Sequence, residues 1–244
     1  MIESLKEKFT TLKMKSCADN IEEVVTVAGK ANLTILETIE QLIDFEMDVR
    51  KKNRIDRLFK ASKLIEKQTI DQFEFNFDTS RKKQKTLILN LMDLGFINQK
   101  KDIIIIGNSG VGKSFLAKCI AYAATQVGIK TLFTRTVEMI NQLKTAEVDN
   151  SLLKELQNYQ SPDLLVCDEL GYLPLGQQGS ELLFQIITAR HEQKSTIITT
   201  NLPFADWGKI FERTSVATAV ADRLVYNSEI LILEGESYRK RNMK

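Results

Sequence analysis

The stretch Gly107-Asn108-Ser109-Gly110-Val111-Gly112-Lys113-Ser114 matches the pattern G-x-x-x-x-G-K-[ST] at every fixed position. Four isoleucines, residues 103–106, stand directly before it and predict a buried strand, because β-branched residues favour extended backbone. Residues 115–127 place their apolar side chains at helical spacing and are followed by Gly128, so they predict a helix. A strand, a glycine-rich loop and a helix in this order form the context of a phosphate-binding P-loop.

The loop also indicates how a nucleotide would be held. Its glycines let backbone N–H groups approach phosphate oxygens, and the start of the helix adds donors and the positive end of a dipole. Lys113 is expected to reach the β- and γ-phosphates, and the Ser114 hydroxyl to ligate Mg²⁺. A solvated turn is the alternative, and the flanking strand and helix argue against it. The predicted nucleotide-binding residues are Gly107, Asn108, Ser109, Gly110, Val111, Gly112, Lys113, Ser114 and Phe115.

Composition limits the class of protein. The 244 residues carry a formal net charge of only +2, so any nucleic-acid footprint has to be local. Three cysteines that lie far apart and a single histidine argue against a zinc site and against disulfides. Residues 1–15 are charged throughout, unlike a signal peptide, and no stretch approaches the roughly 18 apolar residues of a membrane span. We therefore expect a cytoplasmic protein that does not enter the membrane.

Residues 1–72 predict a small all-helical domain. Apolar residues recur at helical spacing, Gly29 is a predicted helix end, and Thr34-Ile35-Leu36-Glu37 has the form of a capping box that opens the next helix. Basic residues gather between Arg50 and Lys67. This run is either a solvated helix face or a stripe that contacts DNA or protein, and both possibilities stay open here.

Residues 73–101 predict a junction and a leading helix. The alternation in Phe73-Glu74-Phe75-Asn76-Phe77 predicts a short extended segment. Residues 81–85 are polar and basic and predict a connector, and residues 86–94 predict a helix that Gly95 ends. From 102 to 240, strands alternate with helices, which is typical of an α/β fold with a parallel sheet flanked by helices. The strands predicted after the P-loop are residues 129–134, 164–167, 196–200 and 230–233.

A second motif predicts the other half of a nucleotide site. Four apolar residues, 164–167, deliver Asp168 and Glu169 to the carboxyl end of a buried strand, where ligands bind in α/β folds. Asp168 is expected to hold Mg²⁺ through water, and Glu169 to polarise the attacking water. Two solvated acids are the alternative, which the P-loop upstream disfavours. Asn201 ends the next predicted strand and is either a sensor of the γ-phosphate or a turn residue.

The acidic pair also separates classes of nucleotide-binding protein. A glutamate after the aspartate suits a motor-type ATPase, so the predicted enzyme hydrolyses ATP to ADP and phosphate. A Ras-like GTPase would need an N-K-x-D element, and the sequence has none. A small-molecule kinase would usually carry an arginine-rich lid, which is not found. A stand-alone kinase nevertheless remains a rival, and it predicts turnover by a monomer.

Four segments together resemble the IstB-like ATP-binding proteins, the ATPase helpers of two-gene insertion-sequence transposition systems. They are residues 107–114, 165–172, 195–204 and 234–239. This family is related to the DnaC and DnaI helicase loaders in the initiator clade of AAA+ ATPases. The resemblance extends over nearly the whole chain. It implies an ASCE-type P-loop NTPase core without a separate C-terminal lid, preceded by the helical domain.

The resemblance implies further site residues. Asn201 matches sensor 1, Arg223 the arginine finger that reaches the γ-phosphate held by a neighbouring subunit, and Arg239 a nucleotide-site position. The implied catalytic residues are Lys113, Glu169, Asn201 and Arg223. Relatives of this clade assemble around DNA through the region between the P-loop (Walker A) and the acidic pair (Walker B). The residues in the corresponding positions are Arg135, Thr136 and Lys144.

The predicted function is therefore that of an ATP-dependent, oligomeric DNA-binding helper. It is expected to assemble on double-stranded target DNA without sequence preference, to recruit and activate a partner transposase for DNA transposition, and to disassemble on ATP hydrolysis. ATP would bridge neighbouring subunits. A replicative helicase loader is the alternative, because the AAA+ core hardly separates the two functions.

Overall fold

The computed structural model describes residues 1–243 and divides into two compact units, Met1–Arg57 and Leu58–Lys244. The boundary between the units falls within helix α3 (Ile35–Ala61). The division into a helical domain (1–72), a junction with a leading helix (73–101) and an ATPase core (102–240) stays a prediction. In the part of the chain that the structure describes, no helix is long and apolar enough to cross a membrane.

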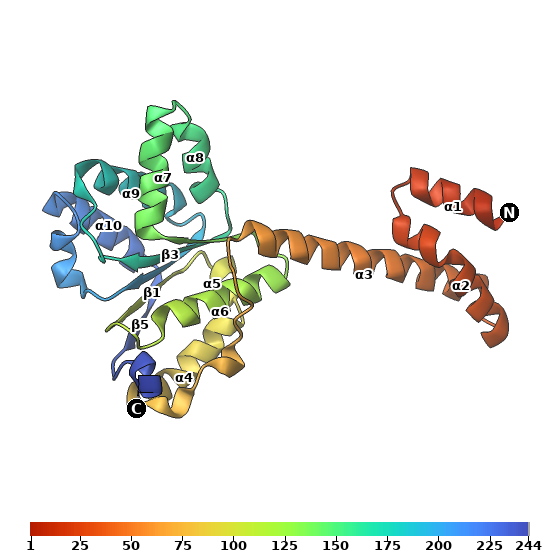
Figure 1. The fold of residues 1–244 in the computed structure, drawn as a ribbon, viewed down its shortest axis with the longest axis horizontal. Helices are drawn as coiled ribbons and strands as arrows, with labels where there is room; N and C mark the ends of the chain where they lie inside the picture. The colour runs from red at the N-terminus through yellow and green to blue at the C-terminus, as the bar shows by residue number, and fades with distance from the viewer. Residues whose placement is uncertain (244) are drawn as a thin grey trace. The chain divides into compact units, whose positions relative to one another are not determined.

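The first unit consists of α1 (Ile2–Thr11), α2 (Lys15–Ala31) and the first part of α3 (Figure 1). The capping box forms at the start of α3: the Glu37 carboxylate accepts the Thr34 amide at 2.7 Å, and Thr34 Oγ1 accepts the Glu37 amide at 3.3 Å. The predicted helix end at Gly29 is wrong. The helix continues to Ala31 because Asn32, which tolerates left-handed backbone, ends it with φ 53°.

A buried carboxylate joins α2 to α3 within this unit. Glu46 Oε2 accepts the backbone amides of Ser16 at 2.9 Å and Cys17 at 3.3 Å at the start of α2. Glu46 Oε1 pairs with Arg50 Nε at 2.7 Å. Burial raises the pKa of Glu46, but the hydrogen bonds from Arg50 and the two amides outweigh burial and hold it below its usual value. Arg50, the first residue of the basic run, thus pairs with a buried carboxylate of its own unit, although its side chain is largely exposed.

The second unit is built on a five-stranded parallel sheet in the order β2-β3-β4-β1-β5. The strands are β1 (Asp102–Gly107), β2 (Thr131–Arg135), β3 (Leu164–Leu170), β4 (Ser195–Thr200) and β5 (Ser228–Leu233). This confirms the predicted α/β class and its strands. Because β4 lies between β1 and β3, it separates the strand that leads into the P-loop from the strand that carries the acidic pair.

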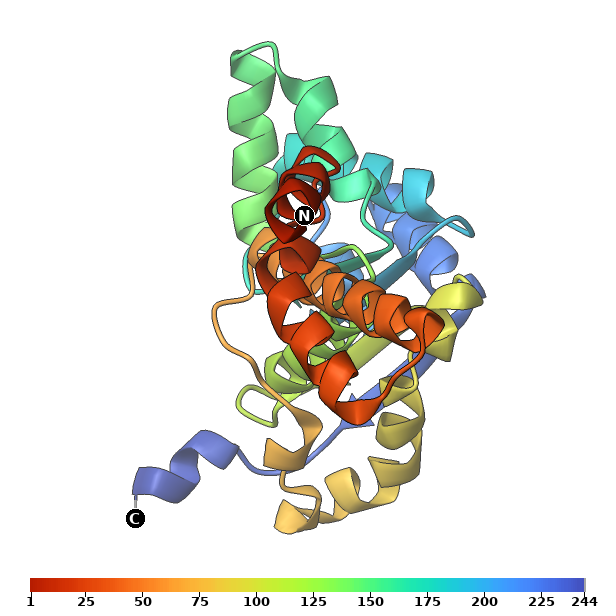
Figure 2. The same ribbon diagram turned by 90° about the vertical axis from the view of Figure 1, so that its right-hand side faces the viewer.

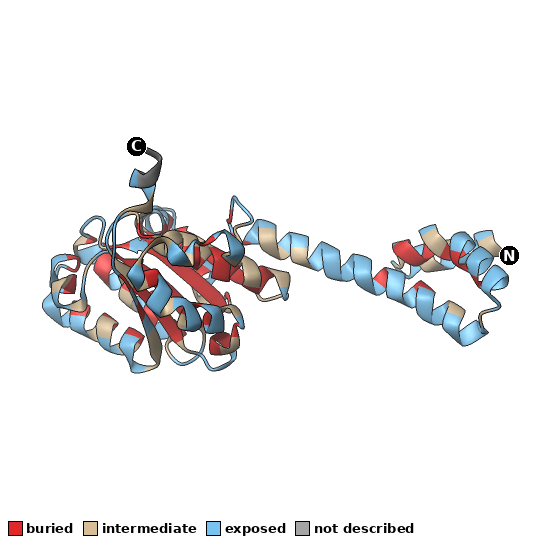
Figure 3. Ribbon diagram, turned by 90° about the horizontal axis from the view of Figure 1, so that it is seen from below, coloured by how far each residue is buried: buried red, intermediate tan, exposed pale blue. Residues whose placement is uncertain are grey.

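Helices cover both faces of the sheet (Figures 1 and 2). They are α4 (Thr79–Met92), α5 (Gly95–Asn98), α6 (Lys113–Gln126), α7 (Thr136–Val148), α8 (Leu152–Gln160), α9 (Gly176–Arg190) and α10 (Thr214–Tyr226). Ile104 belongs to the core shared with α7 to α10, whereas Ile103 and Ile105 belong to the core shared with α4 and α6. Side chains alternate between the faces of a strand, so one run of isoleucines serves both cores. Figure 3 shows the buried residues concentrated along these strands and the helix sides that face them.

The junction is not extended, contrary to the prediction for residues 73–77. It forms two short 3₁₀ turns, η1 (Ile70–Gln72) and η2 (Phe75–Phe77). The alternating aromatics surround a buried arginine on the next helix instead of lining one face of a strand. That helix, α4, also begins earlier than predicted, because Asp78 caps it by accepting the Arg81 amide at 2.8 Å.

A polar cluster is buried at the edge of the sheet where the strands begin, opposite the edge that carries the P-loop and the acidic pair. Arg190 is 1% exposed and donates to the carbonyl oxygens of Pro162 at 2.8 Å and Ser195 at 2.5 Å. The Asp102 carboxylate accepts the Thr196 amide at 2.6 Å. Burial raises the pKa of Asp102 from 3.8 to about 7. These groups tie the starts of three strands together.

Candidate nucleotide-binding site

The P-loop joins β1 to α6 and places its lysine at the first position of the helix. Gly110 and Gly112 have φ values of 83° and 104°, a left-handed region that side chains other than glycine rarely adopt. Lys113 Nζ donates to the carbonyl oxygens of Gly107 at 2.7 Å and Asn108 at 2.8 Å. The ammonium group therefore lies over the loop. Burial lowers the pKa of Lys113, opposed by Asp168 and Glu169.

A threonine on β4 holds the acidic pair. Asp168 is 3% exposed and accepts the hydroxyl of the fully buried Thr199 at 2.5 Å. The same hydroxyl oxygen accepts the backbone amide of Glu169 at 2.9 Å. From the other side, the Thr136 hydroxyl donates to the carbonyl oxygen of Asp168 at 3.0 Å. The carboxylate that is expected to hold Mg²⁺ is thus oriented by β4, and the backbone of Asp168 is held by the first residue of α7.

Glu169 occupies unusual backbone. Its φ is 59°, and the pairing of β3 with β4 is irregular between Cys167 and Leu170. A residue with a Cβ in left-handed conformation costs about 1 kcal/mol or more. Unlike its buried neighbours on β3, the Glu169 side chain is exposed, and it contributes to the wall of a cavity. Arg135 Nε lies 3.8 Å from its Oε2, in a partly exposed ion pair.

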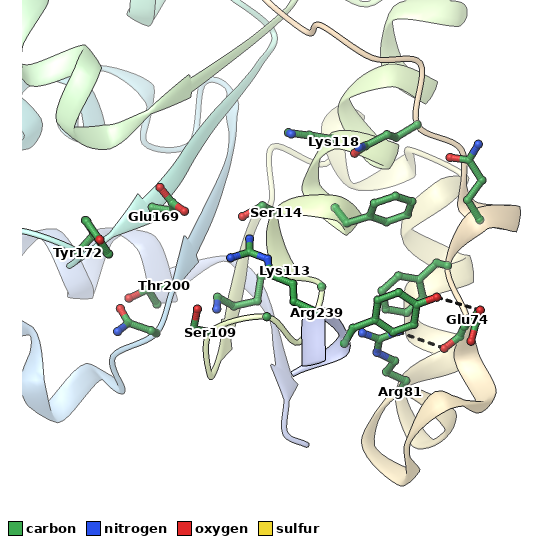
Figure 4. A pocket seen from close by; sticks show the side chains of 18 of the residues that line it. Glu74, Arg81, Ser109, Lys113, Ser114, Lys118, Glu169, Tyr172, Thr200 and Arg239 are labelled. Atoms are coloured by element: carbon green, nitrogen blue, oxygen red, sulfur yellow. Dashed lines mark hydrogen bonds between the residues drawn. The ribbon is translucent and has the colours of Figure 1, made fainter. Parts of the chain in front are cut away.

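A cavity of about 700 Å³ connects the predicted phosphate-binding and acidic residues. Figure 4 shows Glu169, Tyr172 and Thr200 to one side of Lys113, and Glu74 and Arg81 to the other. The loop lies between these ends. The remaining lining residues outside the loop are Gln68, Gln72, Phe73, Phe115, Lys118, Arg135, Asn201, Tyr238 and Arg239. The volume is within the range of small-molecule sites, roughly 300–1,000 Å³.

The residues present fit a nucleoside triphosphate with Mg²⁺. Lys113 and the loop amides offer donors for phosphate oxygens. The Ser114 hydroxyl and the Asp168 carboxylate are oxygen ligands of the kind Mg²⁺ prefers. At the aromatic end, Gln68 Oε1 is a buried acceptor without a hydrogen-bond partner among the described residues, which suits an amino group on a base. The cavity and the residues beside it thus present groups suited to the phosphates, to Mg²⁺ and to a base.

Some of the other predicted site residues line the cavity, and others lie away from it. Arg239 and Asn201 line the cavity, whereas Arg223 does not: it lies on α10, with its guanidinium 4.9 Å from the Phe184 ring. Of the predicted DNA contacts, Arg135 is exposed beside Glu169. Lys144 lies on α7, with Nζ 3.5 Å from the Leu175 carbonyl oxygen.

Thr136 was also expected to contact DNA, but its side chain is 1% exposed, and its hydroxyl supports Asp168 instead. Sequence reasoning missed two features around the cavity. Thr199 was predicted only to be part of a strand. The three polar residues Thr199-Thr200-Asn201 at the end of that strand could have indicated a site. Arg81 appeared as part of a polar connector, but it is 3% exposed and donates to the P-loop carbonyl of Val111.

Relatives encoded by insertion sequences match nearly the full length of the chain. A protein of insertion sequence IS232 from Bacillus thuringiensis subsp. berliner, named as an ATP-binding protein, is 36% identical over 228 residues, covering 93% of this chain and 90% of that protein. The corresponding protein of IS5376 from Geobacillus stearothermophilus is 34% identical over 244 residues, covering 100% and 96%. The corresponding protein of IS21 from Pseudomonas aeruginosa is 32% identical over 235 residues, covering 96% and 88%.

Solved structures give the same fold. The crystal structure of the DnaC helicase loader superposes with a TM-score of 0.61 and 26% identity, covering 68% of this chain and 96% of that chain. AMPPCP-bound DnaA from Aquifex aeolicus has a TM-score of 0.59 at 16% identity, covering 74% and 55%, and shows the fold alone. The second unit is therefore a P-loop core of the AAA+ type. The model of the IstB-like ATP-binding proteins matches residues 7–244, and this chain belongs to that family.

Proposed function

We propose that this chain is an Mg²⁺-dependent ATPase that acts as the helper protein of an insertion-sequence transposition system. One observation carries the chemical part: Lys113 on the P-loop and the pair Asp168-Glu169 line or adjoin one cavity, with Thr199 holding the pair in place. The names of the relatives carry the biological part, because they are proteins of insertion sequences.

The residues of the site divide the work of hydrolysis among them. Loop amides and Lys113 bind and orient the phosphates. Ser114 and Asp168 hold Mg²⁺, which supplies charge neutralisation at the phosphates when it is bound. Glu169 orients the attacking water and accepts its proton, and Asn201 contacts the γ-phosphate or that water. Its position in the cavity wall gives Glu169 access to the water that the buried Asp168 lacks.

The aromatic end of the cavity is suited to a base, and the proposed base is adenine. Phe73 and Phe115 stack on each other with ring centroids 6.2 Å apart. The unpartnered Gln68 Oε1 would accept a hydrogen bond from the 6-amino group of adenine. Guanine presents a carbonyl oxygen at that ring position, which would leave the Gln68 acceptor unpaired at a cost in affinity.

Arg223 is proposed to act on the nucleotide of a neighbouring copy. It does not line the cavity of its own chain, its Nη1 donates to the Ala219 carbonyl oxygen at 2.9 Å, and its side chain is partly exposed. A cation that stabilises the developing charge on the γ-phosphate can come from a second subunit. On this proposal ATP holds subunits together in an oligomer, and hydrolysis releases them.

The oligomer is proposed to form on double-stranded DNA without sequence preference and to recruit and activate a transposase. Arg135, Lys144 and the exposed residues of the basic run are the candidate phosphate contacts.

A helicase loader is the second candidate function, and the likeness to DnaC favours it. Stimulation of the transposase of an insertion sequence from this family, set against loading of a replicative helicase, separates the two functions.

Two matched variants test the proposed ATPase. Lys113→Ala should lose ATP binding and ATP-dependent assembly on DNA, whereas Glu169→Gln should bind ATP, fail to hydrolyse it and remain on DNA. Lys154→Ala, at an exposed lysine on α8, is the control and should match the wild type in all three measurements. Full assembly by Lys113→Ala, or normal hydrolysis by Glu169→Gln, would contradict the proposal.

A further inference from the structure

The buried arginine beside the P-loop has an unusual environment. Arg81 lies in the first turns of α4 and is 3% exposed. The guanidinium carbon stands 4.6 Å from the ring centre of Phe73, 4.9 Å from that of Phe77 and 5.0 Å from that of Tyr238. These rings come from the junction and from the segment after β5, which are more than half the chain apart in sequence. One cation therefore joins two distant segments through aromatic contacts.

Hydrogen bonds connect the same guanidinium to the P-loop and the junction. Arg81 Nη2 donates to the carbonyl oxygen of Val111 at 2.8 Å, and Nη1 donates to that of Glu74 at 3.3 Å. The Asp78 carboxylate lies 3.4 Å from Nε. A buried charged donor forms a strong bond to a carbonyl oxygen, and the planar fork lets one group serve several acceptors. The buried guanidinium of Arg81 therefore holds the carbonyl group of Val111 in a fixed position.

The segment after β5 rests on the other side of the loop. The Tyr238 amide donates to the carbonyl oxygen of Gly110 at 2.9 Å, and the phenolic hydroxyl of Tyr238 donates to Glu74 Oε1 at 2.9 Å. A Cβ added to Gly110 would lie 2.1 Å from Ser237 Oγ, so the contact is close. Arg239 follows directly and lines the nucleotide cavity (Figure 4). The position of Arg239 therefore depends on how Tyr238 is seated.

We propose that Arg81 is a positioning residue of the nucleotide site, which fixes the P-loop through Val111 and, through the ring of Tyr238, directs Arg239 into the cavity. Arg81 itself needs no contact with the nucleotide. The fixing of the loop is a property of the protein without ligand, whereas the effect on nucleotide affinity rests on the proposed function.

A lysine at this position provides the discriminating variant. Arg81→Lys keeps the positive charge, but an ammonium group lacks the planar fork that reaches both carbonyl oxygens while lying against three rings. Lys82→Ala changes an exposed residue of the same helix turn and serves as the control. A second pair acts on the segment after β5: Tyr238→Leu removes the ring, whereas Tyr238→Phe keeps the ring and removes its hydroxyl.

Hydrogen exchange without nucleotide tests the fixing of the loop. Arg81→Lys and Tyr238→Leu should each speed the exchange of amides in residues 108–112 and 234–239, with the strands β1 and β3 unchanged. Tyr238→Phe should exchange more slowly than Tyr238→Leu in both segments, and Lys82→Ala should behave as the wild type. Unchanged exchange in both Arg81→Lys and Tyr238→Leu would overturn the inference.

Titration with the fluorescent analogue mant-ATP and Mg²⁺ tests the effect on the site. Arg81→Lys should weaken binding by about tenfold or more, as expected for the loss of a buried charged hydrogen bond. Arg239→Ala should weaken it too, and the double variant should show less than the product of the two effects, because both act through one group. Wild-type affinity in an Arg81→Lys protein that exchanges faster would overturn the positioning role. If the wild type itself fails to bind mant-ATP, the proposed function fails, and faster exchange still supports the fixing of the loop.

Discussion

Replacing Thr199 by valine tests how the acidic pair is held. Valine has nearly the shape of threonine but lacks the hydroxyl, so the fully buried site at the end of β4 stays filled. The hydroxyl makes two bonds: it donates to Asp168 Oδ1 at 2.5 Å and accepts the Glu169 amide at 2.9 Å. Both are lost in Thr199→Val, and the strained backbone at Glu169 loses the hydrogen bond that its amide donates to this hydroxyl.

The magnitude follows from these two bonds. A hydrogen bond to a charged group contributes about 1.5–3 kcal/mol and a neutral one about 1 kcal/mol, so we expect the free energy of unfolding to fall by about 3 kcal/mol. For a chain of this size that corresponds to a melting temperature lower by roughly 6–12 °C. The P-loop is not touched, so affinity for nucleotide without Mg²⁺ should stay close to that of the wild type. Hydrolysis should fall further than binding, because Asp168 and Glu169 lose their alignment.

Thermal unfolding and steady-state ATP hydrolysis are the assays, with Thr134→Val as the matched control. Thr134 is a buried threonine on β2 whose hydroxyl donates to the carbonyl oxygen of the next residue, Arg135, at 3.2 Å. The control should lose at most about 1 kcal/mol and hydrolyse ATP normally. If Thr199→Val melts and hydrolyses as the control does, the hydroxyl does not hold the acidic pair, and this account of the site is refuted.

Three further predictions concern other parts of the molecule. The pKa of the Asp102 carboxyl is about 7 in the folded protein, whereas its ordinary value is 3.8, so the folded state binds this proton more tightly than the unfolded state does. The free energy of unfolding therefore falls as pH rises from about 4 to about 7. Urea unfolding near pH 5 and near pH 8 should show a fall of about 2–3 kcal/mol that Asp102→Asn lacks. Arg135→Ala should weaken DNA binding and reduce its salt dependence by about one charge, while changing stability by less than about 1 kcal/mol, measured by titrations at several salt concentrations. Glu46→Gln should destabilise the first unit by about 1–2 kcal/mol, seen as faster limited proteolysis there, with mant-ATP affinity unchanged.

The parts of the site that sequence could predict are those whose chemistry is local. Gly107 to Ser114 form one continuous loop, and Asp168 and Glu169 follow one apolar strand, so spacing alone indicated both. The capping box at Thr34 was predictable for the same reason, because its partners are three residues apart. In each of these cases the pattern and the interaction occupy the same short stretch.

The missed features depend on residues distant in sequence. Arg81 is buried because rings from the junction and from Tyr238 surround it, and nothing in the basic stretch around it indicates those partners. The alternation of residues 73–77 suggested a strand because periodicity does not distinguish a strand from aromatics that turn around a cation. Thr199 acquires its role only because the sheet order places β4 beside β3.

The left-handed backbone at Glu169 has a consequence for engineering. A glycine would adopt φ 59° without strain, so this position holds a carboxylate where the backbone itself favours another residue. Selection for thermal stability alone would therefore tend to accept Glu169→Gly, and such a protein would lose the carboxylate that is proposed to orient the attacking water. Libraries designed to stabilise this protein should therefore leave Glu169 unchanged.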